Sequence, residues 1–171
     1  MPQLSKTRRL VRLGLLTALA LIIFVVEMQI PTPVPVPGVK LGLANIITVY
    51  AVYRYRWHEV LAILLIRVML GAVFGGHLMA IPFSLTGGLL CLGGMLILRH
   101  FIDEEHVWIA SLFSAVLHNL GQTAAAIVVM QTTAVITYLP FLIFTGSIAG
   151  VFTGIAAQLL MKKLKLNKAE K

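Results

Sequence analysis

The sequence predicts an all-α integral membrane protein, with six transmembrane helices in a single membrane domain over residues 1–171. Of the 171 residues, 59% are hydrophobic and only 12% are charged, whereas soluble domains carry about a quarter charged residues. The mean hydropathy is +0.95. Nearly the whole chain divides into apolar segments of about 20 residues, the length of a membrane-spanning helix. The lipid bilayer is therefore the expected surrounding of this domain.

Six helices are expected in chain order, and local sequence signals mark where several of them end. Their approximate ranges are 10–28, 41–55, 58–74, 78–100, 107–130 and 138–164. A proline-rich loop at 29–40 ends the first helix, because alternating prolines favour a stiff, extended conformation. The run Gly75-Gly76-His77 ends the third helix. Pro82 and the glycine pairs at 87–88 and 93–94 predict a kink or close packing in the fourth helix.

The distribution of basic residues predicts the orientation in the membrane. With the N-terminus in the cytoplasm, the cytoplasmic segments hold 12 of the 14 basic residues, leaving Lys40 outside and Arg67 within a span. Because Lys and Arg concentrate in cytoplasmic loops, both termini are expected inside and the loop at 29–40 outside. The same clusters account for the net charge of +8, so no nucleic-acid partner is expected.

Small residues spaced four apart recur in three of the predicted helices. They are Gly146, Gly150 and Gly154 in the sixth helix, Gly71 and Gly75 in the third, and Gly14 and Ala18 in the first. Such residues share one helix face and let two backbones approach closely. Packing inside the bundle is the favoured interpretation for the glycines, and contact with a partner protein is the alternative. Both interpretations stay open for Gly14 and Ala18.

Polar residues inside the predicted spans are the candidate functional residues, because ionisable groups are costly in a membrane and usually face the bundle interior. Arg67 lies in the middle of the third helix and needs an anion. That anion is either a substrate, a helix C-terminus, or Glu27 in a structural ion pair. In the fifth helix His118 and Gln122 are four residues apart and share a face, beside Asn119. An interhelical hydrogen-bond network and the lining of a ligand site stay open for these three residues.

A polar cluster with a positive bias is expected toward the outer face, where Arg67 is joined by Gln29, Lys40, Asn45 and His77. This composition predicts a small anionic or amphipathic ligand. The candidate ligand-binding residues are Glu27, Lys40, Asn45, Arg67, His77, His118, Asn119 and Gln122.

Sequence motifs of several enzyme classes are absent from the chain. It contains no GxxxxGK[ST] phosphate loop, no HExxH and no GxSxG. Asp103-Glu104-Glu105 is the one acidic cluster, which we expect in a solvated turn, and paired aspartate motifs that would hold Mg²⁺ on a diphosphate are missing. Cys91 is the only cysteine, and no Cys/His spacing predicts a metal site. We therefore expect no catalytic residue, metal or cofactor, and a separate energy source for any transport.

The segment PGVKLGLANIITVY, residues 37–50, resembles the Gx transporter family, also labelled heptaprenyl diphosphate synthase component I, and the likeness covers almost the whole chain. That family is similar to the substrate-binding S components of energy-coupling-factor (ECF) vitamin transporters. The resemblance implies a six-helix protein of the bacterial plasma membrane that binds a small molecule near the outer face. The loop after the first helix would cover that molecule, with Lys40 and Asn45 beside it.

The resemblance also implies a partner, a transmembrane coupling protein driven by two ATPases. Gly14 and Ala18 stand where S components carry the paired alanines that contact this coupling protein. The expected function is capture of a vitamin-like, flavin-like or isoprenoid-related molecule for ATP-driven uptake. The alternative is a non-transporting accessory membrane subunit in isoprenoid or quinone metabolism or in extracellular electron transfer. An independent ion-coupled carrier is a third hypothesis, although the internal repeat that it predicts is not evident.

Overall fold

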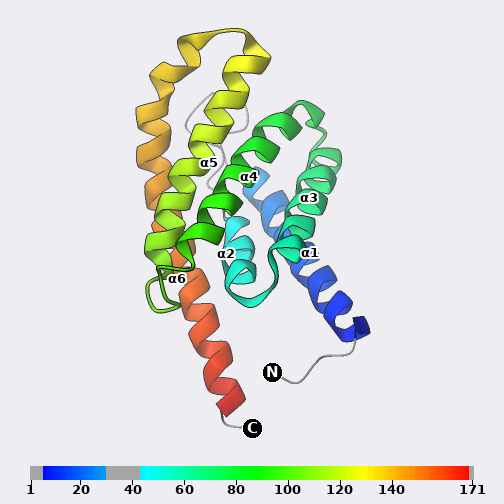
Figure 1. The fold of residues 1–171 in the computed structure, drawn as a ribbon. Coiled ribbons are helices and arrows are strands. Elements are labelled where there is room, and N and C mark those ends of the chain that lie inside the picture. Colours follow the sequence, from blue (N-terminus) through cyan, green and yellow to red (C-terminus); the bar gives the residue numbers. More distant parts are fainter. Residues whose placement is uncertain (1–5, 30–42, 170–171) are drawn as a thin grey trace.

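A computed structural model describes residues 6–29 and 43–169, and within them it contains helices and no strand. The α-helices are α1 (Lys6–Met28), α2 (Asn45–Arg54), α3 (Trp57–Phe74), α4 (Ile81–Leu98), α5 (Val107–Met130) and α6 (Leu139–Ala169). Two 3₁₀-helices, η1 (Leu78–Ala80) and η2 (Thr133–Tyr138), precede α4 and α6 (Figure 1). The predicted all-helical fold and its six α-helices are confirmed for the described part of the chain.

Five of the helical segments are long and apolar enough to cross a membrane, and α2 is the exception. It has ten residues, which make a helix about 15 Å long, half of the roughly 30 Å hydrocarbon core. Six complete spans therefore stay a prediction. The second helix begins at Asn45 and not near residue 41, because Leu43 and Ala44 form a turn and residues 41 and 42 lie outside the described part.

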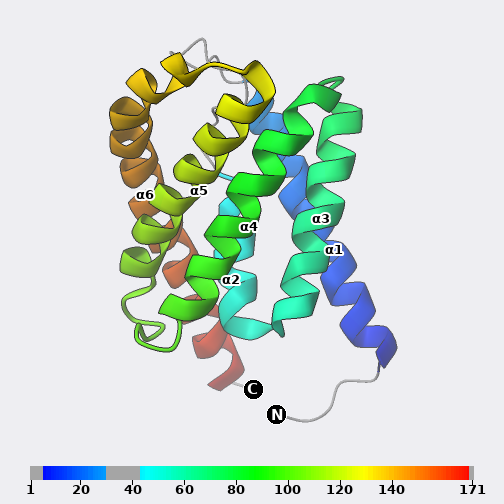
Figure 2. The same cartoon turned by 45° about the horizontal axis from the view of Figure 1, so that its top comes forward.

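The short helix α2 lies at the centre of the bundle, where it contacts α1, α3, α4 and α6. In both views it begins partway along the bundle, and not at the level where α4 begins (Figures 1 and 2). Its buried residues are Ile47, Thr48, Val49, Ala51 and Val52. Val49, Ala51 and Val52 join the main hydrophobic core, to which α3, α4, α5 and α6 also contribute. The core is therefore assembled around α2.

Glycine and proline determine where α3 ends and α4 begins. Gly76 has φ +66°, a left-handed conformation that favours glycine and terminates a helix, so the predicted break after α3 is confirmed. Pro82 lies in the first turn of α4, where its missing N–H removes no intrahelical hydrogen bond. Pro82 therefore starts the helix and does not kink it. Of the predicted kink or close packing in this helix, close packing is confirmed, because a Cβ at Gly87 would lie 2.7 Å from Cγ of Gln122 and one at Gly88 would lie 2.8 Å from Cδ1 of Leu64.

The glycine series of α6 packs against α5. A Cβ at Gly154 would lie 2.5 Å from the Cα of Trp108, and one at Gly150 would lie 3.0 Å from the carbonyl oxygen of Ser111. Distances this short leave room only for hydrogen at both positions. Packing inside the bundle, the favoured interpretation of this series, is confirmed.

The small residues of α1 and α3 differ in their surroundings. Gly71 of α3 faces the ring of Phe24 on α1, so it too packs inside the bundle. Gly14 and Ala18 are exposed on the surface of α1, and a Cβ at Gly14 would meet nothing within 4 Å. These two residues therefore do not pack within the described bundle.

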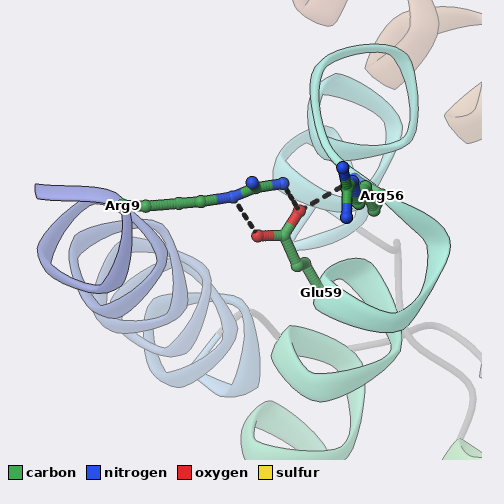
Figure 3. Close-up of polar contacts among 3 residues, drawn as sticks. All are labelled: Arg9, Arg56 and Glu59. Carbon is green, nitrogen blue, oxygen red and sulfur yellow. Dashed lines mark hydrogen bonds and ion pairs between the residues drawn. The ribbon is translucent and has the colours of Figure 1, made fainter. Parts of the chain in front are cut away.

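An ion pair joins the first turns of α1 and α3 (Figure 3). Arg9 donates from Nη2 to Oε2 of Glu59 at 2.7 Å and from Nε to Oε1. The same carboxylate accepts a hydrogen bond from the backbone N–H of Arg56 at 2.9 Å, which caps the first turn of α3. Leu13, Leu16 and Phe24 of α1 also pack against the bundle, so this pair adds a polar contact to an apolar one.

The acidic run 103–105 forms a turn between α4 and α5 that differs in part from the expected solvated turn. Asp103 and Glu105 are exposed, as predicted. Glu104 instead pairs with Arg54 at the end of α2, with 3.0 Å between Oε2 and Nη2. Nearby, Arg99 Nη1 donates to the carbonyl oxygen of Val52 at 2.9 Å, which satisfies a backbone group at the same end of α2.

We predict that Gly154→Ala destabilises the protein, because the added Cβ would lie 2.5 Å from the Cα of Trp108. Overpacking of this kind costs about 1–3 kcal/mol. Gly93→Ala is the matched control, since a Cβ there meets nothing within 4 Å and alanine favours a helix over glycine. The midpoint of thermal unfolding in detergent should fall for Gly154→Ala alone. Equal midpoints for the two variants would contradict the packing role.

We also predict that Glu59→Gln loosens α1, because the Arg9 guanidinium loses its carboxylate partner. Contacting residues give non-additive effects, so Arg9→Gln combined with Glu59→Gln should lower the unfolding midpoint by less than the sum of the single changes. The control is Glu59→Gln combined with Arg54→Gln, because Arg54 pairs with Glu104 instead. Additive effects in both pairs would show that the Arg9–Glu59 contact contributes nothing to stability.

Candidate functional site

Three of the predicted ligand-binding residues gather where α2 begins. Arg67 of α3 donates from Nη1 to Oδ1 of Asn45, the first residue of α2, at 3.3 Å. Glu27, near the end of α1, accepts a hydrogen bond from the backbone N–H of Ala44 at 3.4 Å. Arg67 and Glu27 are buried, with exposed fractions of 6% and 3%. The end of α1, the start of α2 and the middle of α3 therefore meet around a buried arginine.

The backbone of α2 explains why polar groups collect at this point. The first four N–H groups of an α-helix have no partner within the helix, and they carry a partial positive charge that favours an anion. Because Ala44 is buried at the start of α2, water does not hydrogen-bond to these N–H groups as it does at a surface. The Glu27 carboxylate accepts the hydrogen bond of the Ala44 N–H instead.

Arg67 is not held by the direct ion pair with Glu27 that the sequence suggested. Within 6–29 and 43–169 no ion pair within 4.0 Å joins these two side chains, although they lie close enough for their charges to interact. The hydrogen-bond partner of Arg67 is a neutral amide, Asn45. Its Nε is buried and has no hydrogen-bond partner among the described residues.

His118 and Gln122 face α4 from the middle of α5. A Cβ at Gly87 of α4 would lie 3.1 Å from Cε1 of His118 and 2.7 Å from Cγ of Gln122, so the predicted shared face is confirmed. The His118 Nδ1 is buried without a hydrogen bond of good geometry to a described residue, and the backbone of Gly87 lies beside the ring. His118 therefore lies at the contact of α5 with α4, whereas Glu27, Asn45 and Arg67 form the group that we call the α2-start cluster.

Asn119 faces a different part of the bundle. Its Nδ2 donates to the carbonyl oxygen of Leu142 on α6 at 2.8 Å, and its side chain is buried. Gly146 makes room for the amide, because a Cβ there would overlap Nδ2. This geometry favours the interhelical hydrogen bond over ligand lining for Asn119.

The remaining predicted residues lie elsewhere. His77 is exposed and lines a pocket with Phe24, Gly71 and Ser84, between α1, α3 and α4. The pocket has a volume of about 10 Å³, room for one water molecule. Lys40 and most of the loop at 29–40 lie outside the described residues, so their predicted role at the ligand stays a prediction. Gln29 is described and exposed.

Sequence reasoning missed two contributions to this region. The backbone N–H of Ala44 became important because α2 begins inside the bundle, and Gly87 because it brings α4 against His118. The sequence did carry a signal for the first contribution. The basic Arg54 follows Asn45 by only nine residues, so a helix between them is too short to span the membrane. Among the described side chains, no group of three or more His, Cys, Asp or Glu could hold a metal ion.

We predict that Asn119→Ala lowers stability, because the carbonyl of Leu142 loses its donor inside the bundle. A buried polar group left without its partner costs about 1–3 kcal/mol.

His118→Ala and Arg67→Ala should show the opposite pattern to Asn119→Ala, with insertion and folding retained but the bound small molecule lost. Thermal unfolding and native mass spectrometry of the detergent-purified variants measure the two effects. Failure of His118→Ala or Arg67→Ala to fold would assign that residue a structural role.

Comparison with known families gives one match. A family model described as heptaprenyl diphosphate synthase component I matches residues 16–160, a range that contains the whole α2-start cluster. A comparison with curated proteins found no match, and neither did one with solved structures. Because the matched range covers most of the chain, this protein belongs to the heptaprenyl diphosphate synthase component I family.

Proposed function

We propose that the chain is an S-component-like, substrate-binding subunit of a membrane transporter. It captures a small vitamin-like, flavin-like or isoprenoid-related molecule at the outer face, and a separate ATP-driven coupling module completes the uptake. The observation that carries the proposal is the α2-start cluster, in which Glu27 and Arg67 are buried among helices of membrane-spanning length. Ionisable residues at such depth are costly and usually mark a substrate or ion pathway.

The orientation is part of the proposal, with both termini in the cytoplasm of a bacterial cell. Figures 1 and 2 show the first turn of α1 and the last turns of α6 at the same end of the bundle. Arg8 and Arg9 lie on the first turn of α1 and Arg12 on the second, and Lys162 and Lys163 lie near the end of α6. A concentration of basic residues supports a cytoplasmic position for this end. Glu27 lies near the opposite end of α1, which would then lie toward the outer face.

The proposed docking surface for the coupling protein is the face of α1 that carries Gly14 and Ala18. Both residues are exposed, and the open space beside Gly14 supports close approach of a partner helix. We further propose that the chain does not itself transfer prenyl groups and needs no cofactor of its own. This part rests on the sequence, which lacks the paired aspartate motifs that hold Mg²⁺ on a diphosphate.

Purification of the tagged full-length chain from its native membrane tests this function. We predict co-purification of a transmembrane coupling protein with two ATPases, and ATP-dependent uptake after reconstitution of the assembly. Gly14→Leu should abolish co-purification, because the larger side chain keeps the partner helix away. Gly93→Leu is the control, since Gly93 is also exposed with open space beside it. Absence of any coupling protein, or equal behaviour of the two variants, would contradict the docking model.

The family description favours a second candidate function, that of a non-transporting accessory membrane subunit in isoprenoid metabolism. Quinone metabolism and extracellular electron transfer are other settings that we propose for such a subunit. This function predicts stable co-purification with a prenyl-transferring or redox enzyme. It also predicts no ATP-dependent uptake by the purified assembly, which distinguishes it from the transporter.

A further inference from the structure

We propose that the Nε edge of Arg67 binds the carboxylate or phosphate group of a small amphipathic anion at the start of α2. The inference rests on the proposed function, because it names the chemical class of molecule that the α2-start cluster would receive.

The Arg67 guanidinium is only partly hydrogen-bonded. Nη1 is used by Asn45 at 3.3 Å, whereas Nε has no partner although the residue is only 6% exposed. A buried N–H without a partner is costly, and native structures rarely leave one in that state. The edge of a guanidinium that includes Nε presents parallel N–H donors, which match a carboxylate or phosphate.

The described charged groups near Arg67 do not pair with it directly. Among the described residues Glu27 forms no ion pair with Arg67 within 4.0 Å, and one of its oxygens accepts a hydrogen bond from Ala44. The start of α2, a helix of ten residues, adds the partial positive charge of its first turn. Because the Glu27 carboxylate already serves the start of α2, a second anion would be bound chiefly by the donor of Arg67 that has no partner among the described residues, Nε.

Apolar residues of α3 surround Arg67, and this favours an amphipathic molecule. On α3 the buried neighbours one turn from Arg67 are Ile63, Leu64 and Gly71, none of which has a polar side chain. The anionic group would thus meet Arg67, while the rest of the molecule meets apolar side chains.

The test titrates the full-length protein in detergent with sodium phosphate and with sodium acetate, replacing chloride at constant ionic strength. We expect either anion to raise the midpoint of thermal unfolding. Arg67→Gln should weaken the apparent affinity about tenfold or more, as expected for loss of a charge-assisted pair. Arg54→Gln is the matched control, because it removes a cation from the Arg54–Glu104 pair and should keep the wild-type response.

Two further variants separate binding from folding. Arg67→Lys keeps the charge but loses the forked donors, so its affinity should lie between those of the wild type and Arg67→Gln. Asn45→Ala keeps the guanidinium but removes the partner that orients it, so it should weaken the response to both anions. If both Arg67 variants misfold, Asn45→Ala decides the question. Loss of its anion response supports the proposal, and a full response overturns it.

A lipid headgroup is the other source of a phosphate, and nanodiscs of phosphatidylcholine with and without phosphatidylglycerol distinguish it from a soluble anion. Stabilisation by phosphatidylglycerol that Arg67→Gln abolishes assigns the bound phosphate to a lipid. No response to phosphate, acetate or phosphatidylglycerol overturns the proposal, as does a full response in Arg67→Gln. The assay contains no coupling module, so an anion response together with failed co-purification would reject the transporter role and leave the anion site intact.

Discussion

A helix that begins inside a membrane bundle presents N–H groups that only the protein itself or a bound molecule satisfies. The start of α2 is such a point, and three polar residues of the bundle lie around it. Glu27 reaches Ala44 from α1, and Arg67 reaches Asn45 from α3. The cost of burying these charges is acceptable because each lies beside a group of complementary polarity. The depth at which α2 begins therefore decides where the polar chemistry of this protein lies.

The helices of the bundle pack in two different ways. The helices α4, α5 and α6 approach closely because glycine occupies their contacts, as Gly87 and Gly154 do against α5. Helix α1 has few fully buried side chains, and its half-buried Leu13 and Leu16 pack against the hydrophobic core. That core, assembled around α2, connects α1 with the other helices.

The sequence predicted the long helices well, because uninterrupted apolar runs bounded by glycine or charge leave few alternatives, as at 107–130. The start of α2 was predicted less well, since Leu43 and Ala44 are as apolar as the helix that follows. The grouping of Arg67 with Asn45 was predicted from their expected position toward the outer face, and the two side chains do meet. The sequence could not predict that Asn119 and His118 face different helices. Consecutive residues of a helix point about 100° apart, and only the positions of the neighbouring helices show what each side chain contacts.

The contacts at the two ends of α1 join different regions of the molecule. Arg9 and Glu27 are separated by 18 residues, or about 27 Å along a helix, and Leu13, Leu16 and Phe24 pack against the bundle between them. One continuous helix therefore connects the basic end of the bundle with the buried start of α2, and its length sets how far apart these two regions lie.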